Sequence, residues 1–225
     1  MDINADFTKR AVIRPEDYNW VPSPMAGVDR MMLDRVGDEV ARATTIVRFA
    51  PNSEFTSHTH VGGEEFFVLE GVFSDEHTDY PAGTYARNPI GTSHTPRIGS
   101  AGATILVKLF QYEADDQAQI KIDSHKAPWQ QGPSDGLMAL PLHSYGTEKV
   151  ALVKAAPNRD FAAHHHIGGE EIYVLEGIFY DEHGAYPKGT WLRAPHLSAH
   201  HAYTKDEGAT IFVKTGHLMP ASVET

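Results

Sequence analysis

Short apolar runs separated by turn residues dominate the hydrophobic pattern of this chain. The runs FFVLEGVF at 66–73, IYVLEGIF at 172–179 and ATILVKLF at 103–110 are rich in β-branched and aromatic residues. Turn signals interrupt them, for example at 81–83 and 89–91, where Pro and Gly lie two apart. Short strands with Gly and Pro turns between them predict an all-β sandwich or barrel. The helical segments that we expect are confined to the N-terminus and to residues 29–34.

The pattern occurs twice along the chain. Residues 51–108 align without a gap on residues 157–214, and about half of the positions are identical. A weaker match extends upstream, where Trp20 corresponds to Trp129. Each repeat is roughly one hundred residues long, which is an ordinary domain size. We therefore predict two domains, residues 1–114 and 115–225, joined within the polar, Asp-rich segment 113–128.

Charge and composition exclude several classes of protein. The chain has 225 residues and a net charge of −11, from 19 basic and 30 acidic residues that form no long block of one sign. A nucleic-acid surface or attraction to an anionic membrane would need clustered Lys and Arg. There is no cysteine, which excludes disulfides and thiolate nucleophiles. Without a signal peptide or an apolar run of membrane-spanning length, we expect a cytoplasmic protein.

The strongest chemical signal is a duplicated set of metal-ligand residue types. Each member of the first set recurs at the same distance in the second (164 − 58 = 200 − 94 = 106). The two sets are His58, His60, Glu64 and His94, and His164, His166, Glu170 and His200. The first two histidines of each set lie two apart, so on a strand both point to the same face. Duplication of one metal-binding fold explains this spacing.

The donor types restrict the metal. Three neutral imidazoles and a carboxylate suit Fe, Mn, Co, Ni, Cu or Zn, whereas Ca²⁺ and Mg²⁺ prefer oxygen ligands. Four protein ligands leave one or two positions open on a five- or six-coordinate ion, but nearly close a tetrahedral zinc site. We predict two divalent transition-metal ions, one per domain, with zinc or iron favoured over manganese and nickel. The spacing does not distinguish a catalytic ion from a structural one.

The sequence resembles a bicupin. The first cupin motif, G(X)5HXH(X)3-4E(X)6G, matches with Asn52 in place of the leading glycine and ends at Gly71, and the second copy has Asn158 and Gly177. The second motif, G(X)5PXG(X)2H(X)3N, matches at Gly83, Pro89, Gly91 and His94, and at Gly189, Pro195, Leu197 and His200. Leu197 replaces a turn glycine, and the closing Asn is Ile98 or Thr204. The resemblance implies two tandem cupin (jelly-roll) β-barrel domains with metal in both.

A longer sequence pattern, HxHxGGEExxVLEGxFxDE followed by YPxGTxxRxP, resembles the cupin domain of ChrR-type anti-sigma factors. In that family a separate zinc-bearing helical N-terminal domain with a Cys pair binds the sigma factor, and this cysteine-free chain lacks its signature. Related stand-alone cupins with a similar pattern include oxygenases that use iron to cleave carbon–carbon bonds of diketones or hydroxyacetophenones. The resemblance thus implies either a metal-dependent oxygenase of a small organic substrate or a zinc-binding sensor without turnover. Metals that only stabilise the barrels are a third alternative, and an oxalate-type decarboxylase is a minor fourth.

No catalytic acid or base stands out apart from the candidate ligands, so the catalytic residues stay unassigned. The expected partner is a small-molecule ligand or substrate, with no nucleic acid and no membrane. Edge strands that need covering would favour a homodimer, although two domains in one chain can cover each other's edges, so the oligomeric state stays open.

Several residues beside the ligands have structural interpretations. Glu65 and Glu171 alternate with the ligand glutamates on a strand, so we expect solvated carboxylates. For Arg87 and Arg193 we favour an ion pair with an acidic side chain over a substrate contact. The triplets Asp-Glu-His at 75–77 and 181–183 are interpreted as hairpin hydrogen bonds. Lys108 and Lys214 are expected to expose their amino groups, and Phe66 and Val68 to line a pocket at the metal.

Overall fold

The computed structural model describes residues 1–220 and divides the chain into two compact units. Unit 1 contains residues 1–5 and 19–127, and unit 2 contains residues 6–18 and 128–220. Both are built of strands, and within the described residues the only helix is a single 3-10 turn, η1 (Pro15–Asp17). No helix among these residues is long and apolar enough to cross a membrane. The all-β class predicted from the sequence is confirmed.

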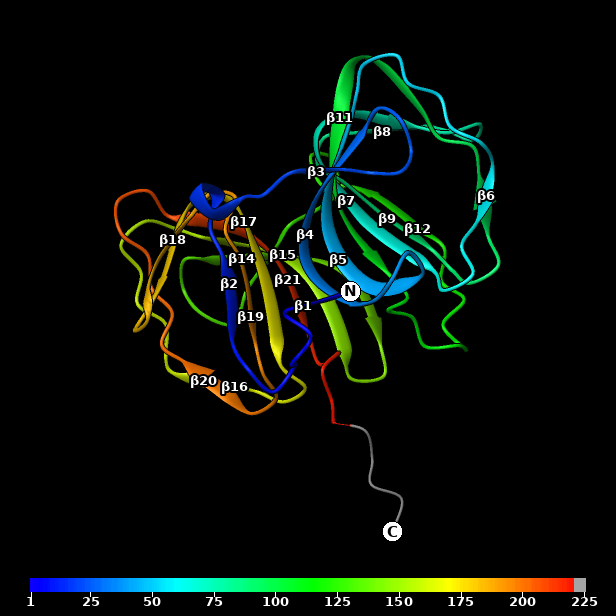
Figure 1. The fold of residues 1–225 in the computed structure, drawn as a ribbon. Helices are drawn as coiled ribbons and strands as arrows, with labels where there is room; N and C mark the ends of the chain where they lie inside the picture. The colour runs from blue at the N-terminus through cyan, green and yellow to red at the C-terminus, as the bar shows by residue number, and fades with distance from the viewer. Residues whose placement is uncertain (221–225) are drawn as a thin grey trace. The chain divides into compact units, whose positions relative to one another are not determined.

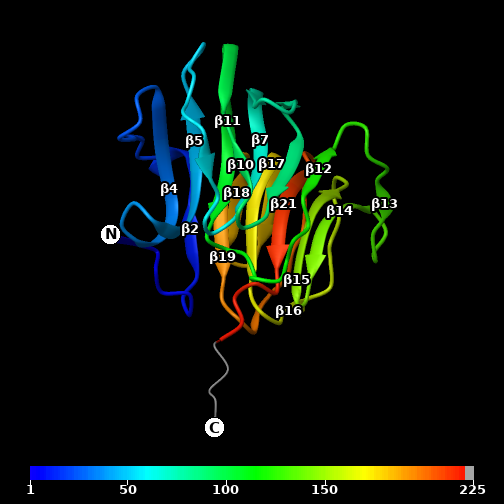
Figure 2. The ribbon, with the colours of Figure 1, turned by 90° about the vertical axis from the view of Figure 1, so that its right-hand side faces the viewer.

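Unit 1 contains a large antiparallel sheet of order β1-β4-β5-β11-β7-β9-β12, with β3 beside β4 and β8 beside β7. Figure 2 shows β4, β5, β11 and β7 in this order. A two-stranded sheet, β6 with β10, completes the unit. The strands are β1 (Asp2–Ile3), β3 (Val21–Pro22), β4 (Val28–Gly37), β5 (Ala41–Phe49), β6 (His58–Thr59), β7 (Glu64–Ser74), β8 (Asp79–Pro81), β9 (Thr84–Asn88), β10 (Ser93–His94), β11 (Arg97–Leu109) and β12 (Ile120–Asp123).

Unit 2 repeats this arrangement. Its large sheet has the order β13-β14-β15-β21-β17-β19-β2, with β18 beside β17, and its small sheet pairs β16 with β20. The strands are β2 (Ala11–Ile13), β13 (Gln130–Gln131), β14 (Leu137–Tyr145), β15 (Glu148–Ala155), β16 (His164–His166), β17 (Glu170–Asp181), β18 (Gly184–Pro187), β19 (Trp191–Ala194), β20 (Ser198–His200) and β21 (Ala209–Thr215).

One strand of each sheet comes from the segment that precedes the other repeat. In unit 2, β2 pairs with β19, with Ala11 opposite Arg193. In unit 1, β12 pairs with β9, with Ile120 opposite the equivalent residue Arg87. Figure 1 shows the blue strand β2 beside the orange strand β19. The exchange makes residues 6–18 part of unit 2, which matters for the site described below.

Residues 29–34, for which a helix was predicted, belong to strand β4, so this prediction is wrong. The segment pairs antiparallel with β5, and Met31 lies opposite Ile46. Met31 and Leu33 are buried, whereas Arg30 and Met32, which alternate with them, are half-buried. Burial that alternates every two residues is typical of a strand. A run this short is compatible with a helix or a strand, and its pairing with β5 makes it a strand.

Each unit has its own apolar core between its strands. The core of unit 1 includes Phe55, Phe66, Val68, Phe73 and Tyr80. That of unit 2 is built from the equivalent positions, Phe161, Ile172, Val174, Phe179 and Tyr186. The side chains of Phe66 and Val68 are almost completely buried within this packing, so they support the sheet that carries the site.

The opposite face of each sheet buries charged side chains. Glu65 and Glu171 are 1% and 3% exposed, so the expectation of solvated carboxylates is wrong. Arg87 Nη1 donates to Glu65 Oε2 at 2.8 Å, and its Nη2 pairs with Asp116, which confirms the ion pair predicted for Arg87. In unit 2, Glu171 accepts a hydrogen bond from Trp191 Nε1. Buried charges are tolerated when they are paired and hydrogen-bonded.

The two strand lysines are also buried, against expectation. Lys108 and Lys214 are 1% and 0% exposed. The amino group of Lys108 donates to Thr44 Oγ1 at 3.1 Å, and that of Lys214 forms an ion pair with Glu148 Oε1 at 3.1 Å. Sequence pattern alone could not reveal these partners because they lie on a neighbouring strand.

Candidate metal centres

The small sheet of unit 1 brings the first three histidines together. Strands β6 and β10 are antiparallel with His94 opposite His58, and His60 follows β6 directly. The chain then turns through Gly63, whose φ of 73° favours glycine. Strand β7 begins at Glu64 immediately afterwards. Four ligand-type side chains from three strands and one turn therefore meet at one end of the barrel.

The donor atoms of the first cluster face a common centre. His94 Nε2 lies 3.2 Å from His58 Nε2 and 3.8 Å from Glu64 Oε2. His60 Nε2 is 3.4 Å from the same carboxylate oxygen. One donor atom from each of the four residues lies within 4.8 Å of all the others. His60, Glu64 and His94 are buried, and His58 is exposed, so the cluster opens to solvent on the His58 side.

The other ring nitrogen of each histidine has an oxygen neighbour. His58 Nδ1 lies 3.4 Å from the carbonyl oxygen of Thr56, and His60 Nδ1 lies 3.0 Å from Thr92 Oγ1. His94 Nδ1 lies 3.4 Å from Asp75 Oδ2. Such partners favour a proton on Nδ1 and leave the Nε2 lone pair available to a metal.

Unit 2 repeats the cluster with small differences. His200 Nε2 is 3.3 Å from His164 Nε2 and 3.7 Å from Glu170 Oε2, and His166 Nε2 is 3.4 Å from that oxygen. His164 Nδ1 lies 3.0 Å from the carbonyl oxygen of Ala162. One ring nitrogen from each of the three histidines lies within 4.8 Å of the other two, and the Glu170 carboxylate is adjacent to His166 and His200. Each domain therefore holds one candidate metal-binding cluster.

Both clusters fit a transition-metal ion. Nε2 of His60 and of His166 and Oε2 of Glu170 are buried and have no hydrogen-bond partner among the described residues. Buried donors and acceptors without partners are costly, and coordination would satisfy them. Ligands about 2.1 Å from a common ion lie roughly 3.0 to 3.4 Å apart, close to the 3.2 to 3.8 Å separations found here. Coordination by these eight residues stays a prediction.

Burial lowers the pKa of the four buried histidines. Desolvation lowers the pKa of His60 to about 4, and the neighbouring His58 adds to the shift. Desolvation lowers the pKa of His166 to about 3 and that of His200 to about 4, with the other imidazoles contributing. The pKa of His94 is lowered by burial, which outweighs the opposing effect of Glu64. Near pH 7 these four imidazoles present lone pairs, which metal binding needs.

We expect metal binding to unit 2 to release a proton from the carboxyl group of Glu170. Burial, with a smaller contribution from Asp181, raises its pKa to about 8, so the metal-free site carries the proton at pH 7. A raised acid pKa means that the group ionises only above about pH 8. Metal coordination should therefore displace close to one proton at pH 7, with little from His166 and His200, which are already neutral. Calorimetric titration in buffers of different ionisation enthalpy measures this number.

A His60→Ala background confines that titration to unit 2, and the release should disappear by about pH 10. Glu170→Gln should abolish it at pH 7. A titration at pH 7 with no proton release would contradict ionisation of Glu170 on binding.

Asp75 and Asp181 belong to the sites in a way that the sequence analysis missed. Asp75 accepts hydrogen bonds from the backbone N–H groups of His77 and Thr78, which confirms the hairpin interpretation of this triplet. It also accepts from Tyr80 Oη at 2.9 Å while facing His94. Asp181 similarly accepts from Tyr186 and lies 3.9 Å from His200 Nδ1. Their exact repetition with the tyrosines was the only sequence signal of this positioning role.

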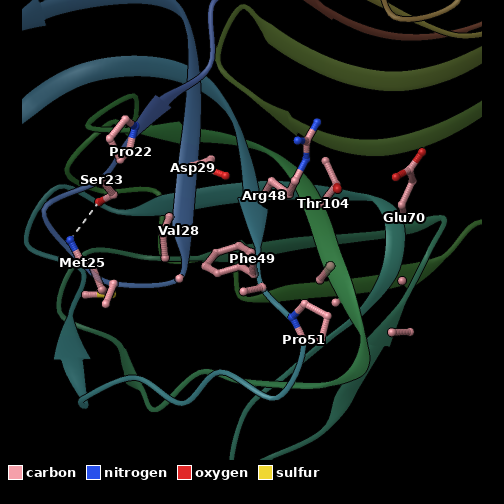
Figure 3. Close-up of a pocket in the computed structure, with 17 residues that line it drawn as sticks. Pro22, Ser23, Met25, Val28, Asp29, Arg48, Phe49, Pro51, Glu70 and Thr104 are labelled. Carbon is pink, nitrogen blue, oxygen red and sulfur yellow. Dashed lines mark hydrogen bonds between the residues drawn. The ribbon is translucent and has the colours of Figure 1, made fainter.

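A small cavity adjoins the cluster of unit 2. Its volume is about 50 Å³, and its lining includes His166, His200, Leu192, Ala194 and Ser198. A larger pocket of about 470 Å³ lies elsewhere in unit 1, between the segments around Pro22, Arg48 and Thr104. Figure 3 shows that pocket, whose lining contains none of the eight candidate ligands. The cavity at the histidines is therefore the better candidate for chemistry.

Two barrels that each bring three histidines and a glutamate together from equivalent strands define the class as a bicupin. The family model for the ChrR cupin-like domain matches residues 8–113 and again residues 117–219. The chain belongs to this family.

Solved structures agree on the fold. A candidate dioxygenase from Nostoc punctiforme matches with a TM-score of 0.74 and 18% identity, covering 99% of this chain and 84% of that one. A candidate glyoxylate-induced protein from Pseudomonas aeruginosa matches with a TM-score of 0.76 and 16% identity, covering 96% of this chain and 92% of that one. Oxalate decarboxylase from Lactobacillus farciminis, in a formate complex, matches with a TM-score of 0.64 and 13% identity, covering 92% of this chain and 86% of that one. No curated protein matches in sequence. Identities this low establish similarity of fold.

Proposed function

We propose that this bicupin is a metal-dependent oxygenase of a small organic substrate and that the unit 2 centre carries the reaction. The observation that supports this most is the cavity against His166 and His200, because it gives a substrate access to the position where an ion would lie. The similarity to the Nostoc candidate dioxygenase adds support. The small volume favours a short diketone over a phenolic ketone.

The residues of unit 2 divide into three roles. His164, His166, Glu170 and His200 would hold the ion, and Asp181 would fix the imidazole of His200. When bound, iron would supply the redox and Lewis-acid chemistry for the reaction with oxygen. Leu192 and Ala194 line the cavity with apolar surface and exclude water from one side. His164 is exposed, so a substrate can approach from its side.

A zinc-dependent sensor is the second candidate. Two observations favour it: membership of the ChrR cupin-like family, and a cavity of only about 50 Å³, which suits recognition of a species with few atoms. In this case both clusters hold zinc and no substrate is converted.

Metal analysis followed by oxygen uptake separates the two functions. Protein purified without chelator is assayed for metal, reloaded with Fe²⁺ anaerobically, and mixed with acetylacetone in an oxygen-electrode cell. Uptake that His166→Ala abolishes and His60→Ala preserves would support an oxygenase centred on unit 2. Zinc in both sites with no uptake after iron loading would overturn the oxygenase in favour of the sensor. Absence of any bound transition metal would contradict both.

A further inference from the structure

The two candidate centres differ at one position beside the cluster, that of Arg10. Arg10 lines the cavity of unit 2 together with His166, Asp181 and His200. It reaches this place because β2, which begins at the next residue, pairs with β19. The equivalent residue in unit 1 precedes Ile120 of β12 and is Gln119. Unit 1 therefore has a neutral amide at the position where unit 2 has a guanidinium.

Arg10 is held in place but retains donor capacity. Its Nη2 donates to Asp181 Oδ2 at 3.0 Å and to Tyr186 Oη, so the side chain is anchored by groups that also support His200. Its Nη1 and Nε have no hydrogen-bond partner among the described residues, and the side chain is 30% exposed. A guanidinium has five N–H donors in a planar fork that matches a carboxylate.

A second polar group on the cavity wall also lacks a partner. Ser198 Oγ is buried and forms no hydrogen bond within the described part of the chain. Its equivalent in unit 1, Thr92, donates to the carbonyl oxygen of Pro89 at 2.7 Å and contacts His60 Nδ1. A buried hydroxyl without a partner needs an explanation, and a bound ligand supplies one.

We propose that the unit 2 centre binds a small carboxylate, with Arg10 and Ser198 donating to its oxygens beside the metal, and that the unit 1 centre does not. The inference rests on the proposed metal site of unit 2, and it concerns a carboxylate ligand at that site rather than the neutral diketone considered above. Attraction to the guanidinium and the ion compensates the desolvation of the anion in so small a cavity. The exchanged strand thus makes the two similar centres chemically unequal.

Formate binding to cobalt-loaded protein tests this directly. In a His60→Ala background, which leaves unit 2 as the loaded centre, sodium formate is titrated at constant ionic strength while the visible cobalt absorption is recorded. Formate should produce a saturable change. Arg10→Gln, which installs the unit 1 residue, should weaken formate binding by about tenfold or more without changing the cobalt stoichiometry, and Arg10→Lys should weaken it less. Formamide, the neutral analogue, should show no dependence on Arg10.

The reciprocal variant covers the case in which Arg10→Gln fails to fold. In a His166→Ala background, Gln119→Arg should confer formate binding on unit 1, where Asp75 and Tyr80 stand in the positions of Asp181 and Tyr186. A formate affinity that Arg10→Gln leaves unchanged, or no gain from Gln119→Arg, would overturn the inference while the metal site stands. Failure of either background to bind cobalt would instead contradict the metal site itself.

Discussion

Replacing Gly71 with alanine is expected to lower the free energy of unfolding by about 3 kcal/mol, from left-handed strain of roughly 1–2 kcal/mol and overpacking of roughly 1–3 kcal/mol. Gly71 has a φ of 71°, and a Cβ there would lie 2.1 Å from the carbonyl oxygen of Gly102. That oxygen belongs to backbone in β11, which pairs with β7 and with β5. The neighbour therefore cannot move without disturbing two strand pairings. Gly177→Ala in unit 2 should behave alike, because its Cβ would lie 2.2 Å from the carbonyl oxygen of Gly208.

Two other glycines separate the contribution of left-handed strain from that of overpacking. Gly91 has a φ of 90° but open space at its Cβ position, so Gly91→Ala should cost only the conformational strain. Gly99 also has open space and lies outside the left-handed region, so Gly99→Ala should leave stability almost unchanged. Urea denaturation followed by circular dichroism and tryptophan fluorescence gives the free energy of unfolding of the four glycine variants. If Gly71→Ala were no worse than Gly91→Ala, the close approach of the two strands would not be what requires glycine.

Local sequence predicted the features that depend on short-range periodicity. The histidines at positions 58 and 60 lie two apart, and the turn glycines place Glu64 at the start of the next strand, so their meeting followed from spacing and the cupin pattern. Asn52 and Asn158 replace the leading motif glycine and have φ values of 56° and 54°. Asn tolerates this left-handed conformation better than most other non-glycine residues, which explains the replacement. Leu197, with a φ of 62°, adopts it where unit 1 has Gly91.

Features that depend on strand pairing could not be predicted in the same way. Nothing in residues 11–13 or 120–123 specifies which repeat their strand joins, because any edge offers the same backbone groups. The burial of Glu65 likewise depends on Arg87 and Asp116, which come from β9 and from the segment before β12. The place of Arg10 beside His200 followed from neither spacing nor composition. It became visible only once β2 was seen in the sheet of unit 2.

Removing one central histidine should empty one centre and leave the other intact. His60 and His166 are buried, and their Nε2 atoms lack any partner in the described structure except the nearby ligand atoms. His60→Ala should reduce the bound metal from two ions to one, because three donors, one of them the exposed His58, bind far more weakly. We expect the affinity of the altered centre to fall by more than about 100-fold, beyond the loss typical for removal of a supporting residue. His166→Ala should do the same to unit 2.

His165 provides the matched control for these variants. It lies on β16 between His164 and His166, is exposed, and by strand alternation points away from the centre. His165→Ala should therefore retain both ions. Metal stoichiometry is measured by elemental analysis after dialysis, and affinity by competition with a chromophoric chelator. Circular dichroism verifies folding of each variant. Two ions still bound with unchanged affinity in His60→Ala would refute the ligand assignment, and loss of an ion in His165→Ala would show that the variants act through folding. Because an ion that binds only the folded state stabilises it by about 4 kcal/mol at a thousand times its Kd, chelation of the unaltered protein should also lower its Tm.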